Sequence, residues 1–573
     1  MVPYVWDRQA CDDGAVRELA AALKLTPIVA RVLCLRGLGD PADAARFLSP
    51  SLSHLHDPFR LTGMTVAVDR TLAAIARRER IAIHGDYDVD GVTSTVILRR
   101  ALELLGADVV HFLPERLRDG YGLLAATVEG LHAQGVALII SVDCGIRGLE
   151  AGRRARELGV DLIVTDHHEP GAELPAALAV INPKRRDCEY PDKHLAGVGV
   201  ALKFVQALCV RSRREKWLPA FVKVAAIGTL ADVVPLVGEN RVIAKLGLEL
   251  LSKGPNKIGL QALLDVSGLA DRTLDSSHVV FAIAPRVNAA GRMSSPDIAA
   301  RLLLAADETM AAEARQLAAQ LDSENARRRQ EEASIVAEAR RIVETDVDVG
   351  ARNVLVVAGE GWHRGVIGIV ASKLVETCHR PAIVLSIEDE IAHGSCRSIP
   401  GFDMLAALDT CAPLFMRFGG HKQAAGLTME AARVKEFRRA INLHADTVLA
   451  PDDLRPRLRI DGAVTFRGLN GDVASQVSQL APFGAGNPRP LFSADDVEIV
   501  DGPRTLKERH LKMALRQDGR TFRAVAWRAV ERQAFLEHHR TRLDFAFSLE
   551  QNTFNGETSL ELMVADARPA SDR

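Results

Sequence analysis

The sequence lacks the cysteine pairs that zinc ribbons and thiol-redox motifs require. Its 573 residues include eight cysteines, and no two of them form a Cys-X-X-Cys pair. Scattered cysteines of this kind are typical of a protein kept in a reducing compartment.

Segments for export or for membrane insertion are also missing. The opening MVPYVWDRQA shows neither the basic start nor the apolar core of a signal peptide. No apolar run reaches the length that spans a bilayer. We therefore expect a cytoplasmic protein with no membrane association.

Aromatic residues are scarce, at 5% of the chain, and the charges nearly cancel, with a formal net charge of -2. A near-neutral total excludes little, because a basic groove can exist on a neutral protein. The length is too great for a single hydrophobic core and indicates three or four domains.

Short apolar runs alternate with helical patterns from about residue 80 onward. Each run is rich in β-branched residues and apolar on both faces, which is typical of a parallel sheet covered by helices. The runs are IAIH (81–84), VVHFL (109–113), ALIISVD (137–143), DLIVTD (161–166) and ALAVIN (177–182).

The pattern changes twice in the second half of the chain. Residues 312–343 are rich in Ala, Glu and Arg and contain no Gly or Pro, which predicts one long helix, or two, between domains. A second α/β unit follows, with strands near 353–359 and 382–387. Alternating strands after Arg455 predict a small antiparallel barrel. The fold class is therefore α/β with a C-terminal β-barrel.

The segment IAIHGDYDVDG places three carboxylates directly after a predicted strand. The strand ends at His84, and a helix opens at Gly91. Between them lie Asp86, Asp88 and Asp90, whose charges repel one another, so the loop indicates a bound cation. A lone acidic turn is more often a helix cap, so this motif needs support from elsewhere in the chain.

Three more segments place acidic or imidazole groups in apolar surroundings, where unpaired charges are costly. Asp143 ends the run LIISVD, and Asp232 interrupts VAAIGTLADVVPL. Asp166, His167 and His168 end a third run, and imidazole is a ligand that Mn and Zn accept.

Carboxyl ends of parallel strands meet in one crevice, so these groups should come together there. We expect a site for two metal ions, with Asp143 sharing its oxygens between them. Mixed carboxylate and imidazole ligands suit Mn²⁺ or Mg²⁺ better than structural zinc. The candidate metal ligands are His84, Asp86, Asp88, Asp90, Asp143, His167 and Asp232.

HGDYDVDG, the strand-end aspartate, the Asp-His-His triplet and GTLADVVPL resemble the motifs of the DHH phosphoesterase superfamily. Later motifs resemble, within it, the RecJ family of bacterial single-strand-specific 5′ exonucleases, over about residues 50–570. These motifs are PRVNAAGRM (285–293), GWHRGVIGIVASKL (361–374), GSCRSIPGFD (394–403), FGGHKQAAG (418–426) and APFGAGNPRPLF (481–492).

The resemblance implies a division of the chain into five parts. These are an N-terminal helical segment (1–50), a DHH catalytic domain (51–305), a connecting long helix (306–345), a DHHA1 substrate-binding domain (346–450) and a C-terminal OB fold (455–570).

The resemblance also assigns roles to site residues. The superfamily pattern places metal ligands at Asp88 and Asp90, and leaves open whether Asp86 or His84 completes the shell of the first metal. Asp166 and His168 are expected as catalytic residues. His168 would either contact a metal ligand without touching the ion or donate a hydrogen bond to the transition state. The expected substrate-binding residues are Arg116, Arg286, Arg292, Ser395, Arg397 and His421.

The barrel region combines aromatic and basic residues. Aromatics at alternating strand positions are more often core than base-stacking, whereas basic residues favour a groove that follows a nucleic-acid backbone. The aromatics are Phe522, Trp527, Phe545, Phe547 and Phe554, and the basic residues are Arg504, Lys507, Arg509, Lys512 and Arg523.

Family membership would imply a 5′-to-3′ exonuclease that releases mononucleotides from single-stranded DNA, in DNA repair and recombination, with two Mn²⁺ or Mg²⁺ ions. A single-stranded-DNA-binding protein and a helicase are the implied protein partners of a monomeric chain. One alternative is a DHH hydrolase of short oligonucleotides or cyclic dinucleotides, against which the barrel and the long helix argue. The other is a non-catalytic strand-binding protein, against which the intact metal motifs argue.

Overall fold

A five-stranded parallel sheet forms the first large unit of this computed structural model, which describes residues 4–116, 118–120, 122–554 and 557–570. Its strands are β2 (Arg80–His84), β3 (Val109–Phe112), β4 (Val136–Val142), β5 (Asp161–Thr165) and β6 (Ala179–Ile181). They lie in the order β3-β2-β4-β5-β6, and each neighbouring pair is parallel. The five strands coincide with the five apolar runs, which confirms the parallel sheet.

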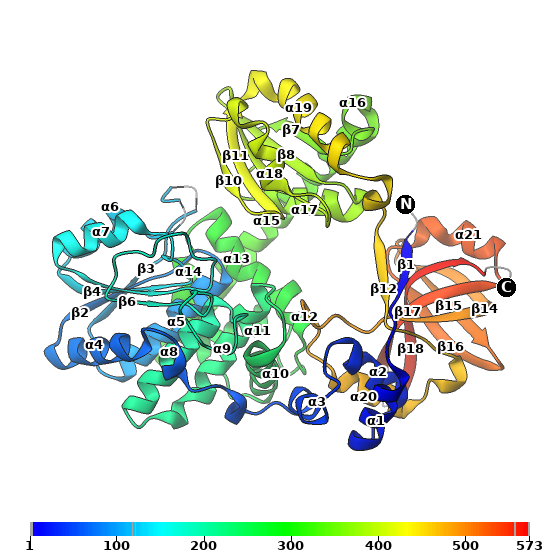
Figure 1. The fold of residues 1–573 in the computed structure, drawn as a ribbon, viewed down its shortest axis with the longest axis horizontal. Coiled ribbons are helices and arrows are strands. Elements are labelled where there is room, and N and C mark those ends of the chain that lie inside the picture. Colours follow the sequence, from blue (N-terminus) through cyan, green and yellow to red (C-terminus); the bar gives the residue numbers. More distant parts are fainter. Residues whose placement is uncertain (1–3, 117, 121, 555–556, 571–573) are drawn as a thin grey trace.

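Helices cover both faces of this sheet. Those that pack on its strands are α4 (Met64–Arg77), α5 (Val89–Leu104), α6 (Ala125–Ala133), α7 (Leu149–Leu158) and α8 (Gly197–Arg211). The unit continues with α9 (Leu218–Ala231), α10 (Gly238–Lys253), α11 (Ile258–Val266), α12 (Ser276–His278), α13 (Ala284–Met293) and α14 (Asp297–Leu304). Figure 1 shows α6 and α7 on one side of the sheet and α4 and α8 on the other. Ile81 and Ile83 enter one core and Ala82 the other, because successive side chains of a strand point to opposite faces.

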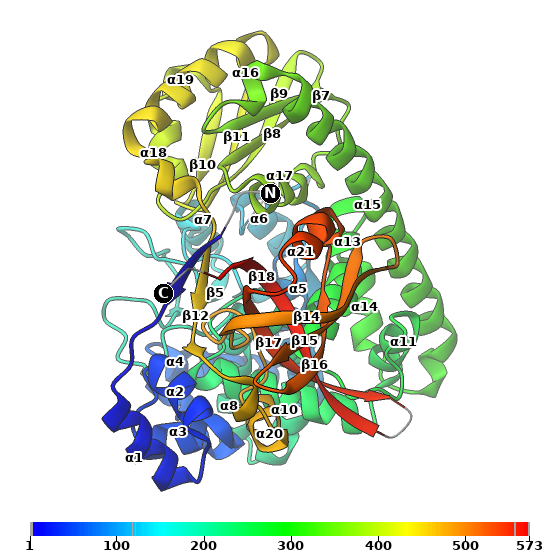
Figure 2. The same ribbon diagram turned by 90° about the vertical axis from the view of Figure 1, so that its right-hand side faces the viewer.

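A single helix of 35 residues, α15 (Ala311–Thr345), leads to the second α/β unit, and Figure 2 shows it running between the two sheets. The second unit contains β7 (Leu355–Glu360), α17 (Ile367–Cys378), β8 (Ala382–Glu388), β9 (Ile391–Arg397), α18 (Met404–Asp409), β10 (Arg417–Gly420), β11 (Ala424–Glu430) and α19 (Val434–Val448), preceded by α16 (Val347–Gly350). Only β7 and β8 were expected from sequence. Strands β9, β10 and β11 extend the sheet in antiparallel fashion.

A closed barrel forms the C-terminal unit. Its strands are β13 (Gly462–Ala463), β14 (Phe492–Leu506), β15 (His510–Gln517), β16 (Arg520–Ala526), β17 (Leu543–Phe554) and β18 (Glu557–Pro569), with helices α20 (Gly471–Gln479) and α21 (Gln533–His538). Pairing of β14 with β17 closes the sheet. The expected barrel is present, but it is not purely antiparallel, because β16 and β18 pair in parallel.

The barrel separates its aromatic from its basic residues. Phe545 and Phe547 are fully buried, as expected of core residues, whereas Trp527 is exposed; the side chain of Phe554 lies outside the described residues. The five basic residues are all exposed. Arg504 lies opposite Lys512, and Arg523 lies opposite the residue two positions further along β15, so the outer face of the sheet carries a basic stripe.

The N-terminal segment is not purely helical, which corrects the expectation for residues 1–50. Helices α1 (Asp13–Leu23), α2 (Pro27–Leu35) and α3 (Pro41–Leu48) follow a strand, β1 (Val5–Arg8). This strand pairs in parallel with β12 (Arg457–Ile460), in the connection that enters the barrel. The pairing depends on a partner about 450 positions away, so local sequence could not reveal it. Among the described residues, no helix is both long and apolar enough to cross a bilayer.

Arg241 on α10 fastens three parts of the chain together. Its guanidinium donates to the carbonyl oxygens of Phe47 at 2.7 Å, Leu480 at 3.0 Å and Ala481 at 3.0 Å. It also stacks on the Phe47 ring, with its central carbon 3.5 Å from the ring centroid. A charge buried to 2% exposure is tolerated because each guanidinium nitrogen donates to a carbonyl oxygen.

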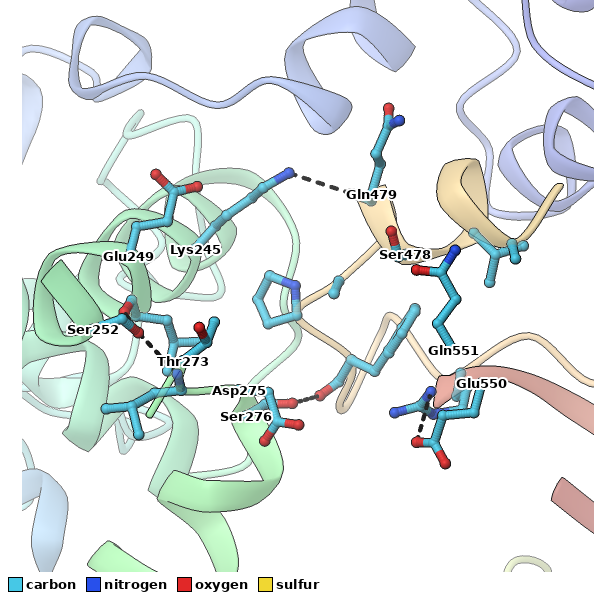
Figure 3. A pocket seen from close by; sticks show the side chains of 18 of the residues that line it. Lys245, Glu249, Ser252, Thr273, Asp275, Ser276, Ser478, Gln479, Glu550 and Gln551 are labelled. Carbon is cyan, nitrogen blue, oxygen red and sulfur yellow. Dashed lines mark hydrogen bonds and ion pairs between the residues drawn. The ribbon is translucent and has the colours of Figure 1, made fainter. Parts of the chain in front are cut away.

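Beside this contact, the first α/β unit and the barrel leave a cavity of about 870 Å³ between them. Figure 3 shows Lys245 and Glu249 of α10 facing Ser478 and Gln479 of α20 and Glu550 of β17 across it. Lys245 donates to the Gln479 carbonyl at 3.3 Å along the rim. Because the packing between the two units is incomplete here, we infer that the contacts of Arg241 contribute much of the free energy that holds them together.

We predict that Arg241→Ala lowers the free energy of unfolding by about 3–5 kcal/mol, because hydrogen bonds to a buried charged group are lost along with its packing. Urea unfolding followed by circular dichroism measures the change. The control is Arg301→Ala, whose side chain is 52% exposed in a pair with Glu313 and should cost less than about 1 kcal/mol. Equal effects of the two substitutions would contradict the fastening role.

Candidate metal centre

The first acidic motif forms a tight loop between β2 and α5. Asp88 caps α5 by accepting from the Gly91 N–H at 3.0 Å, and Asp86 accepts from the Tyr87 N–H at 2.7 Å. A Cβ on Gly91 would lie 2.5 Å from the Asp86 backbone nitrogen, so only glycine allows the loop to close this tightly. The capping role of Asp88 therefore coexists with a loop that gathers three carboxylates.

Asp90 points from α5 toward the start of α8. Its two oxygens accept from the backbone N–H groups of Gly197 and Val198, both at 2.7 Å. The amino-terminal end of a helix favours negative charge, which holds this buried carboxylate in place. A Cβ on Gly197 would approach Asp143 Oδ1 to 2.3 Å, so this glycine lets α8 and the end of β4 meet.

His167 is the centre around which the carboxylates gather. Its Nε2 lies 3.2 Å from Asp143 Oδ1, 3.8 Å from Asp232 Oδ2 and 4.0 Å from Asp90 Oδ2. Asp143 adopts a left-handed backbone with φ of 59° directly after β4, which turns its side chain into the cluster. The structure thus brings together residues from four separate motifs, as the crevice argument predicts.

The hydrogen bonds within the cluster do not offset the repulsion among its carboxylates, so their pKa values are raised. Burial and the neighbouring His168 lower the pKa of His167 to about 3, so the imidazole is neutral and forms no ion pair. Burial and the charge of Asp88 raise the pKa of Asp86 and of Asp232 to about 8. Burial and neighbouring aspartates also raise the pKa values of Asp90 and Asp143 well above the ordinary range.

A divalent cation fits this donor set. Among the described residues, buried atoms without a hydrogen-bond partner include His84 Nε2, Asp143 Oδ1, His167 Nε2 and Asp232 Oδ2. Ligand atoms lie within 4.8 Å of one another in three groups, which are Asp86–Asp88–Asp143, Asp90–His167–Asp232 and Asp143–His167–His168. Asp143 belongs both to the group with Asp86 and Asp88 and to the group with His167 and His168, so it is placed to be a ligand of two ions. Carboxylate oxygens with imidazole nitrogen are ligands that Mn²⁺ and Mg²⁺ accept.

Asp166 was expected as a catalytic residue, but its carboxylate is fully engaged. It accepts from the backbone N–H groups of Ile146, His167 and His168, and its Oδ1 lies 2.7 Å from His168 Nδ1. Burial opposes charge on His168, but the hydrogen bond and charge of Asp166 outweigh it and raise the pKa of His168. Asp166 therefore orients the His168 ring and favours its protonated form.

The loop that carries Asp232 is held under strain. Val233, the next residue, has a φ of 62° and is 67% exposed, although a β-branched residue rarely adopts this conformation. The loop persists because Leu236 N–H donates to the Ala485 carbonyl at 2.8 Å, and the Asn240 side-chain amide donates to the Pro235 carbonyl at 3.1 Å. Strain of this kind is common where a functional side chain must be presented.

A cluster of arginines lies beside the acidic loop. Arg116 stacks over the ring of Tyr87, with its central carbon 5.2 Å from the centroid, and Arg292 donates to the Gly365 carbonyl at 2.8 Å. Burial and the positive charges of Arg116, Arg328 and Arg397 lower the pKa of Arg292 to about 10. Arg328, on α15, was not singled out in the sequence because it lies among many exposed arginines of a long helix.

The start of α17 lies against this cluster of arginines. We call Arg116, Arg292, Ser395 and Arg397, together with the start of α17, the basic pocket. A Cβ on Gly368, in the first turn, would lie 2.9 Å from Ser395 Oγ and 3.3 Å from an Arg397 nitrogen. The glycine therefore lets β9 side chains reach the amino-terminal end of the helix. A hydroxyl, guanidinium groups and a helix start together favour an anion such as phosphate.

The remaining two substrate-binding candidates differ in placement. His421 lines a cavity of about 210 Å³ together with Asp166 and His168, so the second unit reaches the metal centre. Arg286 does not join the basic pocket. It is paired with Asp322 on α15 at 2.8 Å and also donates to the Ala282 carbonyl at 2.7 Å, which fastens α13 to α15.

Comparison with known families divides the chain into three matched regions. Residues 80–229 match the DHH family N-terminal domain, residues 351–445 the DHHA1 domain, and residues 460–566 the RecJ OB domain. The matches follow the parallel sheet, the second sheet and the barrel in turn.

Relatives are similar along nearly the whole chain. A Bacillus subtilis protein named single-stranded-DNA-specific exonuclease RecJ is 39% identical over 98% of this chain and 70% of its own length. The Escherichia coli protein of the same name is 34% identical over 95% of this chain and 96% of its own length. The crystal structure of RecJ with Mn²⁺ from Thermus thermophilus superposes with a TM-score of 0.84 at 32% identity, covering 99% of this chain and 80% of that one.

We predict that Asp143→Asn stabilises the metal-free protein while weakening Mn²⁺ binding. The amide removes one of several crowded charges and tolerates the left-handed backbone, so unfolding at pH 8 should cost about 1–2 kcal/mol more. Mn²⁺ affinity should fall more than about 100-fold, because even residues behind metal ligands contribute 10–100-fold.

The gain in stability should depend on pH in a defined direction. The folded metal-free protein keeps protons on carboxyls such as Asp232, whose pKa is about 8 against an ordinary 3.8, so wild-type stability falls as pH rises between these values. Calorimetry at pH 5 and pH 8 should show the larger gain at pH 8. Asp108→Asn, in a pair with Arg80 at the sheet's other edge and 51% exposed, is the control and should show no gain. A destabilised Asp143→Asn protein would refute the electrostatic account.

Proposed function

The chain belongs to the RecJ family, and from that premise we propose that it is a metal-dependent exonuclease that hydrolyses single-stranded DNA from the 5′ end to mononucleotides. The supporting observation is that a metal-type carboxylate cluster and a basic pocket both lie next to Tyr87. A phosphodiester strand has an interior phosphate for the first and a terminal phosphate for the second.

The cofactor in this proposal is a pair of Mn²⁺ or Mg²⁺ ions. RecJ of Thermus thermophilus is described in complex with Mn²⁺ and with Mg²⁺. Such ions, when bound, polarise the scissile phosphate and acidify a water molecule. The residues that would hold them are Asp86 or His84, then Asp88, Asp90, Asp143, His167 and Asp232.

His168 is the proton-carrying group of the proposed site. Its hydrogen bond with Asp166 favours the protonated form, in which the other ring nitrogen would donate to an oxygen of the scissile phosphate as negative charge develops there. His421 approaches the same cavity from the second unit. The two histidines would orient the phosphate from opposite sides.

The basic pocket is the proposed site for the terminal phosphate of the strand. We assign Arg116, Arg292, Ser395 and Arg397 to the 5′-terminal phosphate, since a guanidinium engages two phosphate oxygens at once. The direction of attack rests on the family, because the geometry of the pocket favours a terminal phosphate without choosing between the two ends.

The barrel extends the proposed substrate path. Arg504, Lys512 and Arg523 share one outer face and would follow the backbone of the strand beyond the cleavage site. In this division of labour, residues 51–305 catalyse, 346–450 bind the end of the strand, 306–345 set the spacing, and 455–570 hold the remaining strand.

Two other functions fit the molecule less well. A hydrolase of short oligonucleotides or cyclic dinucleotides would not need a strand-binding barrel, whereas this chain has one that matches the RecJ OB domain. A non-catalytic strand-binding protein has no use for the buried carboxylates around His167, which are costly to fold. The proposal includes a cytoplasmic monomer that works with a single-stranded-DNA-binding protein and a helicase in repair and recombination.

We predict that the purified chain with Mn²⁺ degrades 5′-phosphorylated single strands to mononucleotides and stops when the 5′ end is blocked. A chelator should silence it, and blunt duplex should resist it. Internally labelled strands blocked at one end or the other, analysed on denaturing gels, measure the direction. Degradation that persists with a blocked 5′ end and ceases with a blocked 3′ end would overturn the polarity.

We also predict that Arg397→Ala lowers kcat/KM on a 5′-phosphorylated strand about thirtyfold, since one charge-assisted contact contributes about 2 kcal/mol. The advantage over a 5′-hydroxyl strand should shrink correspondingly. Arg417→Ala is the matched control, because Arg417 is an exposed arginine of the same sheet that donates to Thr428. A loss of equal size on both kinds of strand end would remove Arg397 from the phosphate pocket.

A further inference from the structure

Asn240, in the first turn of α10, is a fully buried amide that joins two loops next to the metal centre. Its Nδ2 donates to the carbonyl oxygens of His194 at 2.5 Å and of Pro235 at 3.1 Å, and its Oδ1 accepts from the Ala196 N–H at 3.3 Å. Both amide hydrogens and the amide oxygen are therefore engaged with backbone groups. None of these three partners belongs to α10 itself.

The first loop leads into α8 and fixes Asp90. Asn240 holds this loop on both sides of Leu195, by donating to the carbonyl before this residue and accepting from the N–H after it. The first two N–H groups of α8 donate to the oxygens of Asp90, both at 2.7 Å. The backbone of Leu195 also acts on His167, where it opposes the lowering of the pKa. A shift of this loop would therefore move Asp90 and change the surroundings of His167.

The second loop carries Asp232. Pro235, whose carbonyl accepts from Asn240, follows this aspartate by three residues, and Val233 between them has the strained φ of 62°. Strained backbone persists only where its surroundings hold it. One restraint comes from the barrel unit, since the N–H after Pro235 donates to the Ala485 carbonyl at 2.8 Å. Asn240 supplies a restraint from within the first α/β unit.

The first turn of α10 is itself held against α8 and against the segment that precedes α8. Glu239 pairs with Lys203 of α8 at 2.9 Å, and both side chains are buried. Asp192 accepts from the Glu239 N–H at 2.7 Å and from the His194 N–H at 2.9 Å. Asn240 therefore projects from a helix start that is fixed at several points.

We propose that Asn240 is a positioning residue that sets the spacing of one group of metal ligands, Asp90, His167 and Asp232. The inference rests on the proposed metal-dependent function and refines it. The acidic loop and Asp143 form a separate group, held by the loop's own hydrogen bonds and by the turn after β4. Residues that hold metal ligands without touching the ion commonly set its affinity. Loss of Asn240 should therefore weaken one of the two ion sites and spare the other.

The main test is Mn²⁺ titration of the full-length protein, with free Mn²⁺ measured by its six-line electron paramagnetic resonance signal. The wild-type protein should bind two ions. Asn240→Ala should keep one site near wild-type affinity and weaken the other about 10–100-fold. Asn240→Asp keeps the shape and the oxygen that faces Ala196 but loses at least one donor, so it should weaken the same site by a smaller factor.

Asn442→Ala is the matched control. Asn442, on α19, is 3% exposed and makes the same kind of backbone hydrogen bonds between α19 and the start of β7. Its amide donates to the carbonyls of Val354 at 3.1 Å and Arg438 at 2.9 Å, and its oxygen accepts from the Val354 N–H at 2.9 Å. Its loss should destabilise the protein comparably but leave both Mn²⁺ sites unaltered.

A second measurement needs no variant. Hydrogen–deuterium exchange of the metal-free wild-type protein should show that segments 194–198 and 232–236 are already protected, because Asn240 holds both loops before an ion binds. Addition of Mg²⁺ should increase this protection only slightly. Rapid exchange in both segments that Mg²⁺ abolishes would show that the ion itself orders the loops, and would overturn the proposal.

The outcomes separate this inference from the proposed function. Two sites of wild-type affinity in Asn240→Ala would refute the role of Asn240 and leave the metal-dependent nuclease intact. Equal weakening of both sites, or equal losses in Asn240→Ala and Asn442→Ala, would show a general packing defect and would also refute that role. If Asn240→Ala does not fold, Asn240→Asp and the exchange measurement decide. A wild-type protein that neither binds Mn²⁺ nor degrades single strands would refute the proposed function itself.

Discussion

Repulsion among buried carboxylates is the constraint around which the catalytic unit is arranged. Asp90, Asp143 and Asp232 approach a neutral His167 from three directions within 4.0 Å. Such an arrangement is expensive unless protons or cations offset it. The helix start of α8, the glycines at 91 and 197 and the strained turn at Asp143 all hold these groups together. The crowded carboxylates lower the free energy of unfolding, and a bound divalent cation would raise it again.

The basic pocket next to Tyr87 has the opposite character. Burial and the positive charges of Arg116, Arg328 and Arg397 lower the pKa of Arg292. One site therefore favours a cation, and its neighbour favours an anion. In the proposed function, a strand would place an interior phosphate at the first site and a terminal phosphate at the second. Contacts to phosphates would position the strand without reading its bases.

Sequence predicted most of the catalytic unit, because its strands are buried on both faces and their ends carry the acidic motifs. It missed the pairing of β1 with β12 and the antiparallel strands β9, β10 and β11, since these depend on distant partners and have mixed composition. The gathering of acidic and imidazole side chains was predictable from the acidic motifs and the Asp-His-His triplet. The engaged carboxylate of Asp166 and the ion pair of Arg286 were not, because each depends on a hydrogen-bond partner that only the folded chain defines.

The central claim is that one cluster holds two metal ions bridged by a shared carboxylate. Low-temperature electron paramagnetic resonance of the protein titrated with Mn²⁺ tests it most directly, because two Mn²⁺ ions that share a ligand are magnetically coupled. The account predicts saturation at two ions per chain, with a coupled spectrum that replaces the six-line signal of isolated Mn²⁺. Saturation at a single ion, or two ions with uncoupled signals, would contradict it.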